Sequence, residues 1–343
     1  MTSRERVVAA LTFSRPDRAP RDLWPLPYVS LFRKNELDEM MSRFPGDFGR
    51  PELSPGSDDL DLQKLSRSGS YKDEWGSVWQ VGEPGVIGEV KQPVLADLSA
   101  LRTFRPPWET LKERDWNHVN RTCDASQLFM VSGVCARPFE RLQFIRGTEN
   151  LYIDLAYDTA EIRLLIEMVR EFYREDVVAW SRSNVDAVFL MDDWGSNTSL
   201  LINPAQWRVV FKPIYAELCE IIRSAGKFVF FHSDGNIEAI YPDLIEIGVS
   251  ALNSQLFCMD IERLGERYRG KITFWGEIDR QRILPYGTPE EVRAAVHRVR
   301  KALDAGNGGV IAQCEWGKDN SAENIAAVFE AWESNCVSSR GIS

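Results

Sequence analysis

The sequence predicts an α/β fold in which helices cover a parallel sheet. From about residue 125 onward, short apolar runs alternate with longer segments of helical periodicity. Apolar runs of four or five residues are typical of strands that are buried on both faces of a parallel sheet. Strands that alternate with helices form right-handed β-α-β units, which build either a doubly wound sheet or a closed barrel.

Five apolar runs are the predicted strands. They are residues 128–131, 187–191, 228–231, 272–275 and 309–312. Between the first two runs, Ile162, Leu165 and Val169 fall on one face of a predicted helix. Charged residues such as Arg163 and Glu167 lie largely on the opposite face, so the helix is expected to pack its apolar side against the sheet.

Two further helices are indicated by the residues that begin them. Asn203 can cap a helix whose first turn contains Pro204. Thr288 and Glu291 have the spacing of a capping box, which predicts a helix that ends at about Ala305.

The first part of the chain, residues 1–125, is less regular. Residues 3–13 form a predicted amphipathic helix, and the four prolines within residues 16–27 exclude a central strand there. No glycine- or serine-rich linker separates this part from the regular units in residues 126–336. We therefore expect one domain, residues 1–343, in which the first part is an irregular N-terminal elaboration.

Charge and composition exclude several classes of function. The net charge is -10, and Lys and Arg are not clustered as nucleic-acid or anionic-membrane binding would require. The N-terminus lacks the apolar core of a signal peptide, and no apolar run is long enough to span a membrane. The six cysteines form no close pairs, which favours reduced thiols. The expected location is the cytoplasm.

Polar residues directly follow four of the predicted strands. These segments are residues 192–194, 232–234, 276–279 and 313–315. In barrels and doubly wound sheets, ligands bind at the carboxyl ends of the parallel strands. We therefore expect the four segments to line one cavity.

A divalent-metal site is the first hypothesis for this cavity. His232 is one of only three histidines, and Asp234 and Cys314 also supply donor types that zinc accepts, with Glu277 as a fourth candidate. The alternative is that His232 only forms a hydrogen bond with a neighbouring carboxylate. Cys314 favours the metal hypothesis, because its sequence context suggests no packing role.

The remaining candidates are acids and aromatic residues at the strand ends. Asp192 and Asp193 could act as general acid or base or bind a polar substrate, and the alternative is that one of them caps the following segment. Trp194, Trp275 and Trp316 could form the floor of a pocket for a flat aromatic substrate, or they could simply pack at its rim.

Taken together, these segments resemble the uroporphyrinogen decarboxylase-like superfamily, and its corrinoid-linked methyltransferase branch more than its decarboxylases. The resemblance is carried, in chain order, by residues 73–76, 139–141, 146–150, 192–196, 231–237, 243–248, 276–279 and 323–325. It implies a (β/α)8 TIM-type barrel whose active site lies at the C-terminal face.

In the methyltransferase branch, the zinc ligands are a His-x-Cys pair and a later Cys. His232 matches the first ligand and Cys314 the last, but Asp234 stands where the family has the middle Cys. A carboxylate in place of a thiolate makes the site harder and the ion a stronger Lewis acid toward oxygen. The resemblance thus implies an O-methyl donor, such as a methoxylated aromatic compound.

The implied methyl acceptor is Co(I) of a corrinoid. This chain lacks the Asp-x-His-x-x-Gly signature of corrinoid-binding domains, so the corrinoid is expected on a separate partner protein. A homodimer is also compatible with the sequence.

Two alternatives remain open. A decarboxylase of the superfamily would hold its acidic tetrapyrrole with an arginine cluster of the type Arg-Gln-Ala-Gly-Arg, but the corresponding residues 21–27 lack that motif. The other alternative is a catalytically idle barrel that binds a ligand and whose zinc site has decayed at Asp234.

Overall fold

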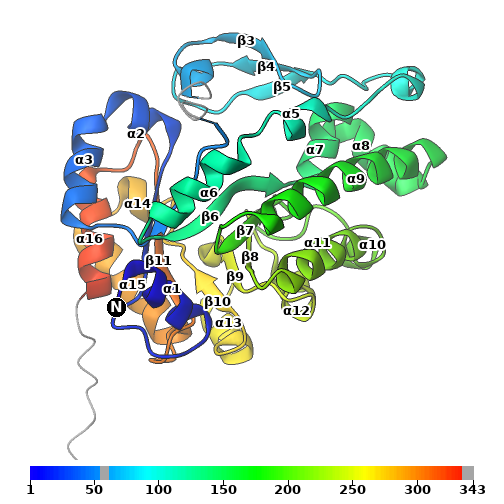
Figure 1. Cartoon of the computed structure of the whole chain (residues 1–343). Helices are drawn as coiled ribbons and strands as arrows, with labels where there is room; N and C mark the ends of the chain where they lie inside the picture. The colour runs from blue at the N-terminus through cyan, green and yellow to red at the C-terminus, as the bar shows by residue number, and fades with distance from the viewer. Residues whose placement is uncertain (55–61, 334–343) are drawn as a thin grey trace, which may run out of the picture. The chain divides into compact units, whose positions relative to one another are not determined.

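The computed structural model describes residues 1–54 and 62–333, which form two compact units (Figure 1). The mid-chain unit is Gly49–Leu252. The terminal unit combines Met1–Phe48 with Asn253–Ser343.

The mid-chain unit contains a small antiparallel sheet and parallel strands that alternate with helices. Its strands are β3 (Gly69–Lys72), β4 (Val78–Val81), β5 (Glu89–Gln92), β6 (Phe129–Ala136), β7 (Ala187–Met191) and β8 (Phe228–Ser233). Its α-helices are α5 (Glu109–Lys112), α6 (Trp116–Ala125), α7 (Pro138–Arg146), α8 (Thr148–Tyr157), α9 (Ala160–Arg182), α10 (Pro204–Val210), α11 (Lys212–Ser224) and α12 (Tyr241–Glu246). Its 3-10 helices are η1 (Leu98–Arg102) and η2 (Glu238–Ile240).

The terminal unit also combines strands with helices. Its strands are β1 (Arg21–Pro25), β10 (Thr273–Trp275) and β11 (Val310–Trp316), while β2 (Phe48–Gly49) and β9 (Ala251–Ser254) fall at the unit boundaries. Its helices are α1 (Ser3–Leu11), α2 (Pro27–Phe32), α3 (Lys34–Arg43), η3 (Leu256–Cys258), α13 (Ile261–Tyr268), α14 (Ile283–Tyr286), α15 (Pro289–Leu303) and α16 (Ala322–Glu333).

Among the described residues, eight strands follow one hydrogen-bonded order, β1-β11-β10-β9-β8-β7-β6-β2, and β3-β4-β5 form the antiparallel sheet. The pairs β1–β11, β10–β11, β6–β7 and β7–β8 are all parallel. Parallel strands that alternate with helices are the arrangement of a (β/α)8 barrel, so the predicted fold class is confirmed.

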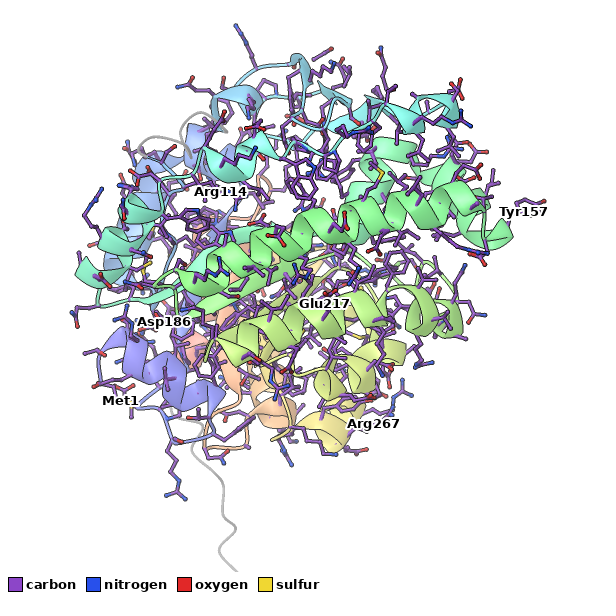
Figure 2. All side chains as sticks on the ribbon, turned by 45° about the vertical axis from the view of Figure 1, so that its right-hand side comes forward. Met1, Arg114, Tyr157, Asp186, Glu217 and Arg267 are labelled. Carbon is purple, nitrogen blue, oxygen red and sulfur yellow. The ribbon has the colours of Figure 1, made fainter. Side chains whose placement is uncertain are left out.

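The long helix α9 forms as its periodicity predicts. Ile162, Leu165 and Val169 are fully buried, and α9 contacts β6, β7 and α11. On the outer side, Glu217 of α11 forms ion pairs with two residues of α9, Arg170 at 2.8 Å and Arg174 at 3.2 Å. Figure 2 shows Glu217 between these two neighbouring helices. Buried apolar contacts and the ion pairs together hold α9 and α11 side by side.

Two segments that carry the family resemblance contact each other in the mid-chain unit. Arg141 of α7 lies 3.3 Å from an oxygen of Asp73 and 3.5 Å from an oxygen of Glu74. Its guanidinium also stacks 4.8 Å from the ring centre of the buried Trp75. This contact fixes α7 against the turn between β3 and β4, and α7 begins beside the candidate site.

The terminal unit contains a strand that the sequence did not predict. β1 lies within the proline-containing residues 16–27 and pairs with β11. The backbone N–H of Ala312 donates to Pro20 and that of Leu26 donates to Trp316, so the ladder continues past both ends of β1. β1 stands at one end of the strand order, a place that tolerates proline, so the prediction that no central strand lies here is not contradicted.

Other local predictions match the structure closely. Thr288 accepts from the backbone N–H of Glu291 at 3.3 Å, and Glu291 accepts from that of Thr288 at 2.7 Å, which completes the predicted capping box. Asn203 caps α10, whose first residue is Pro204. The four cysteines whose sulfur atoms are described are all free thiols. No helix within residues 1–54 and 62–333 combines the length and apolar character that crossing a bilayer requires.

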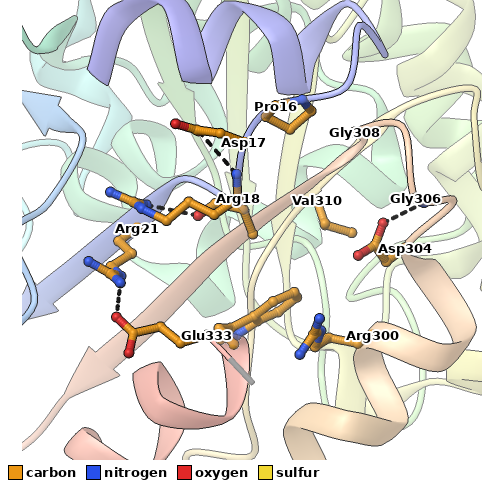
Figure 3. Close-up of a pocket in the computed structure, with 12 residues that line it drawn as sticks. Pro16, Asp17, Arg18, Arg21, Arg300, Asp304, Gly306, Gly308, Val310 and Glu333 are labelled. Atoms are coloured by element: carbon orange, nitrogen blue, oxygen red, sulfur yellow. Dashed lines mark hydrogen bonds and ion pairs between the residues drawn. The ribbon is translucent and has the colours of Figure 1, made fainter. Parts of the chain in front are cut away.

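A polar cavity of about 320 Å³ lies in the terminal unit, beside Val310 at the amino end of β11 (Figure 3). Several of its charged lining residues form ion pairs, either with one another or with residues outside the lining. Arg21 forms an ion pair with Glu333, and Arg18 pairs with Asp47 at 2.7 Å. Because catalytic sites in (β/α)8 folds lie at the carboxyl ends of the strands, this cavity is on the wrong end of β11 for the predicted chemistry.

Candidate metal centre

The pairing of β7 with β8 brings the residues after the two strands together. Met191 is the register partner of His232, and the backbone N–H of Asp192 donates to the His232 carbonyl at 3.0 Å. Two residues after each of these register partners, Asp193 and Asp234 follow the ends of their strands on the same side. The carboxyl ends of adjacent parallel strands thus place one imidazole and two carboxylates at one point.

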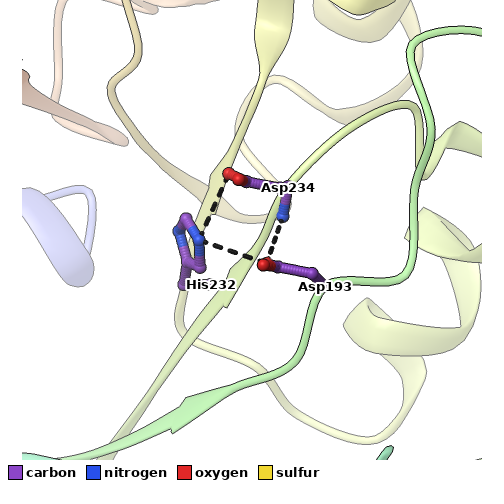
Figure 4. Close-up of side chains that lie close together, drawn as sticks. All are labelled: Asp193, His232 and Asp234. Atoms are coloured by element: carbon purple, nitrogen blue, oxygen red, sulfur yellow. Dashed lines mark hydrogen bonds and ion pairs between the residues drawn. The ribbon is translucent and has the colours of Figure 1, made fainter. Parts of the chain in front are cut away.

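Figure 4 shows the resulting cluster, in which His232 faces both acids. Nε2 of His232 lies 3.3 Å from Oδ1 of Asp234 and 3.5 Å from Oδ1 of Asp193. The backbone N–H of Asp234 donates to Oδ1 of Asp193 at 2.9 Å, which orients that carboxylate. One donor atom from each side chain lies within 4.8 Å of the other two.

Two glycines allow the loops after β7 and β8 to approach closely. A Cβ on Gly195 would lie 2.5 Å from the backbone nitrogen of Asn236. Gly235 has φ +77°, and a Cβ there would lie 2.2 Å from the backbone of Gly195. No other residue fits at either position without moving the backbone, and the same crossing sets the spacing of Asp193 and Asp234.

The charge state of the cluster follows from its surroundings. His232 is buried, while the side chains of Asp193 and Asp234 are 37% and 27% exposed. Burial by itself lowers the pKa of His232, but its hydrogen bonds to the two carboxylates and their negative charges outweigh burial and raise the pKa well above its usual value. Without a cation, the two acids hold His232 as an imidazolium.

The donor set fits a divalent metal ion. Neutral imidazole and carboxylate oxygen are both zinc ligands, and two carboxylates make the set harder than a thiolate site would be. A cation would replace the imidazolium proton as the charge that offsets Asp193 and Asp234, so metal binding releases that proton. Asp193 therefore joins His232 and Asp234 as a candidate ligand, whereas the sequence suggested it as an acid or base.

Asp192, its neighbour, is turned away from this cluster. It is fully buried and accepts hydrogen bonds from the backbone N–H groups of Phe139 at 2.9 Å and Glu140 at 2.7 Å, and from the hydroxyl of Tyr215 at 2.5 Å. Burial, together with the charge of Glu140, raises the pKa of Asp192 well above its usual value. Asp192 thus holds the first turn of α7, which lies earlier in the chain, whereas the sequence suggested a cap for the segment that follows the pair.

The three tryptophans of the strand ends are all fully buried. Trp194 stacks on Phe139 with ring centres 3.9 Å apart and donates to the Tyr215 oxygen at 3.0 Å. The indole N–H of Trp275 donates to Asp22 at 2.8 Å, and that of Trp316 donates to the Asn320 carbonyl at 3.0 Å. These contacts describe packing, and the predicted contact of the tryptophans with substrate stays a prediction.

The other two predicted ligands, Glu277 and Cys314, belong to the terminal unit and are both buried. Burial, followed by the charges of Glu315 and Glu277, raises the pKa of the Cys314 thiol well above its usual value. The thiol is therefore protonated in the absence of a cation, and a metal would have to displace that proton. The prediction that these two residues share an ion with His232 and Asp234 stays a prediction.

Glu140 is a candidate site residue that was not predicted from the sequence. It lies in the segment 139–141 that carries the family resemblance, but nothing in the local sequence shows that its carboxyl group is buried. The charges of Asp193, His232 and Asp234 all act on its pKa. Only the folded structure shows that the first turn of α7 lies within electrostatic reach of the end of β8.

The comparisons with known proteins agree with this architecture. The family model described as Uroporphyrinogen decarboxylase (URO-D) matches residues 83–334. A solved "methyltransferase from Methanosarcina mazei" superposes with a TM-score of 0.70 at 14% identity, over 97% of this chain and 98% of that chain. A xylanase of glycoside hydrolase family 10 from Gloeophyllum trabeum gives 0.48 at 10% identity, over 96% and 98%. At 14% identity the likeness to the methyltransferase is one of fold alone. No curated protein matches the sequence significantly.

Proposed function

Because the chain belongs to the uroporphyrinogen decarboxylase (URO-D) family, we propose that it is a metal-dependent methyltransferase of that family. It moves a methyl group from an O-methyl donor, such as a methoxylated aromatic compound, to a corrinoid that a partner protein carries. The observation that carries the proposal is the cluster of His232 with Asp193 and Asp234 at the ends of β7 and β8. The fold likeness to the methyltransferase from Methanosarcina mazei supports it.

In this proposal His232, Asp193 and Asp234 hold the ion, which is zinc. A bound divalent ion supplies a Lewis acid that stabilises negative charge on the ether oxygen as the methyl group leaves. The protein's part is to keep the three donors in place, through the β7–β8 pairing and the backbone hydrogen bond to Asp193. Cys314 and Glu277 are proposed as further ligands.

The charge around the cluster disfavours the decarboxylase alternative. Asp193 and Asp234 place two carboxylates at the ends of β7 and β8, and without a bound cation these would repel a polycarboxylate substrate. In the segment that corresponds to the decarboxylases' arginine cluster, Arg21 is buried and pairs with Glu333. A neutral methyl ether avoids that repulsion.

Methyl transfer can be tested without knowing the partner protein. The zinc-loaded enzyme is mixed with chemically reduced cobalamin and a series of methoxylated aromatic compounds, and methylation of the cobalt is followed by absorbance. We expect transfer by the wild type and by Asp38→Asn, a control whose side chain is 60% exposed on α3. Asp193→Asn and Asp234→Asn should lose most activity. Transfer that survives both substitutions would refute the proposed site.

The contribution of Cys314 is tested separately by mass spectrometry of the bound metal. A lower zinc content in Cys314→Ala than in the wild type would support its role as a ligand. Equal content in both proteins would remove Cys314 from the ligand set and leave the cluster of His232 and the two acids unaffected.

A further inference from the structure

Glu140 lies in the first turn of α7, immediately after β6 ends. Its backbone N–H donates to Asp192 at 2.7 Å, so the start of the helix is fixed relative to the end of β7. Its side chain is only 12% exposed. The carboxyl group is therefore held inside the fold, in contrast to the exposed glutamates on the outer faces of the helices.

One oxygen of the Glu140 carboxyl group has an ion-pair contact but no hydrogen bond within the protein around it. Within the described residues, its buried Oε2 has no hydrogen-bond partner. The nearest paired cation is Arg137, whose Nε lies 3.7 Å away, beyond hydrogen-bond distance, and that Nε likewise has no hydrogen-bond partner. An unsatisfied buried polar atom costs free energy, and a catalytic role is one of the explanations for such atoms in native proteins.

The surroundings of this carboxyl group raise its pKa above the usual value. Burial raises the pKa of Glu140 to about 7, with Arg137 and His232 lowering it and Asp193 and Asp234 raising it. Charges of the metal centre therefore reach Glu140 from β7 and β8, and Arg137 faces it from the end of β6. A carboxyl group with a pKa near the working pH suits proton transfer.

We propose that Glu140 is the general acid that protonates the leaving oxygen of the methyl donor, an inference that rests on the proposed function. The methyl–oxygen bond breaks with its electron pair remaining on oxygen. The new bond to carbon would be to the acceptor named in the proposed function, the reduced corrinoid of a partner protein, which would supply the electron pair. The proton passes from Oε2 of Glu140 to the oxygen, and solvent returns a proton to the carboxylate afterwards.

The acid is positioned by a buried chain of hydrogen bonds. Trp194 donates to Tyr215, and Tyr215 donates to Asp192. Asp192 in turn accepts from the backbone N–H of Glu140. Asp192 is thus a positioning residue, which fixes the start of α7 and so where the carboxyl group of Glu140 can reach.

The test compares Glu140→Gln with the wild type on methyl ethers of phenols that differ in acidity. Free reduced cobalamin is the acceptor. Glutamine has nearly the same shape but cannot donate a proton as an acid, so kcat should fall by about 10²- to 10⁴-fold for ethers of weakly acidic phenols. Ethers of acidic, nitro-substituted phenols need no proton and should lose much less. Glu149→Gln, an exposed residue of α8, is the matched control and should behave as the wild type.

Metal content and folding are measured on the same samples, and Glu140→Gln should bind zinc as the wild type does. A loss of activity that is equal for all ethers, or no loss, would overturn the role of Glu140 while the proposed function stands. If the wild type methylates cobalamin from no ether, the proposed function fails, and this inference fails with it. Independently of activity, the metal-free wild type should show an infrared band of a protonated carboxyl group that Glu140→Gln lacks, and a band unchanged in the variant would overturn the role of Glu140.

Discussion

The hydroxyl of Tyr215 donates a hydrogen bond of 2.5 Å to Asp192, and Trp194 donates to the Tyr215 oxygen at 3.0 Å. The same carboxylate accepts the backbone N–H groups of Phe139 and Glu140. Burial, with the charge of Asp192, raises the pKa of Tyr215 well above its usual value, so the hydroxyl keeps its proton. This connection joins α11 to the first turn of α7 and to the candidate site.

Removing the hydroxyl tests this connection. Tyr215→Phe leaves the buried Asp192 with one donor fewer, and the free energy of unfolding should fall by about 1–3 kcal/mol. Urea denaturation followed by circular dichroism measures the change, with Tyr286→Phe, a residue 78% exposed, as the control. Activity should fall as well, because Glu140 is less firmly placed. Unchanged stability would show that the hydrogen bond contributes nothing.

An added Cβ at the crossing of Gly195 and Gly235 has two costs, backbone strain and steric clash, which substitutions can separate. Gly226 has φ +74° with no atom within 4 Å of an added Cβ, so Gly226→Ala should cost only the backbone strain, about 1–2 kcal/mol. Gly235→Ala adds the 2.2 Å clash with Gly195 and should cost more. It should also reduce the bound zinc, which Gly226→Ala leaves unchanged. Equal zinc in both variants would contradict the role of the crossing.

The raised pKa of Glu140 predicts that the free energy of unfolding decreases as pH rises. Burial raises its pKa to about 7 in the folded protein, whereas an unfolded chain has a pKa of about 4.3. Between these values the folded state binds more protons than the unfolded one, so stability falls as pH rises through the window. The loss should reach on the order of 3 kcal/mol above pH 7.

The measurement is a set of urea midpoints from about pH 5 to about pH 8 on metal-free wild type and Glu140→Gln. The variant lacks the titrating group, so it should lose less stability over this range and exceed the wild type at the upper end. Parallel curves for the two proteins would mean that Glu140 is ionised in both the folded and the unfolded state.

Local sequence patterns were sufficient to predict most elements around the site. The strands at 187–191 and 228–231 and the capping box at Thr288 appear where the patterns place them. β9, residues 251–254, was missed because Ala-Leu-Asn-Ser contains no apolar run, although the strand is buried on both faces. A buried asparagine in a sheet interior is satisfied by tertiary partners, which no local pattern contains.

The site was predicted less completely than the fold. His232 and Asp234 are two residues apart at the end of one predicted strand, so their side chains were expected to lie close together. Which acid of the pair Asp192 and Asp193 joins them depends on strand register, and this comes from pairing with a segment 41 residues away along the chain. Glu140 depends on tertiary burial, which a single sequence does not reveal.

The metal content of the purified protein tests the central claim most directly. Inductively coupled plasma mass spectrometry should find about one divalent ion per chain in the wild type and in Asp38→Asn, and far less in Asp193→Asn. A wild type that folds, is given zinc, and still binds none would contradict the account and favour a ligand-binding protein without metal chemistry.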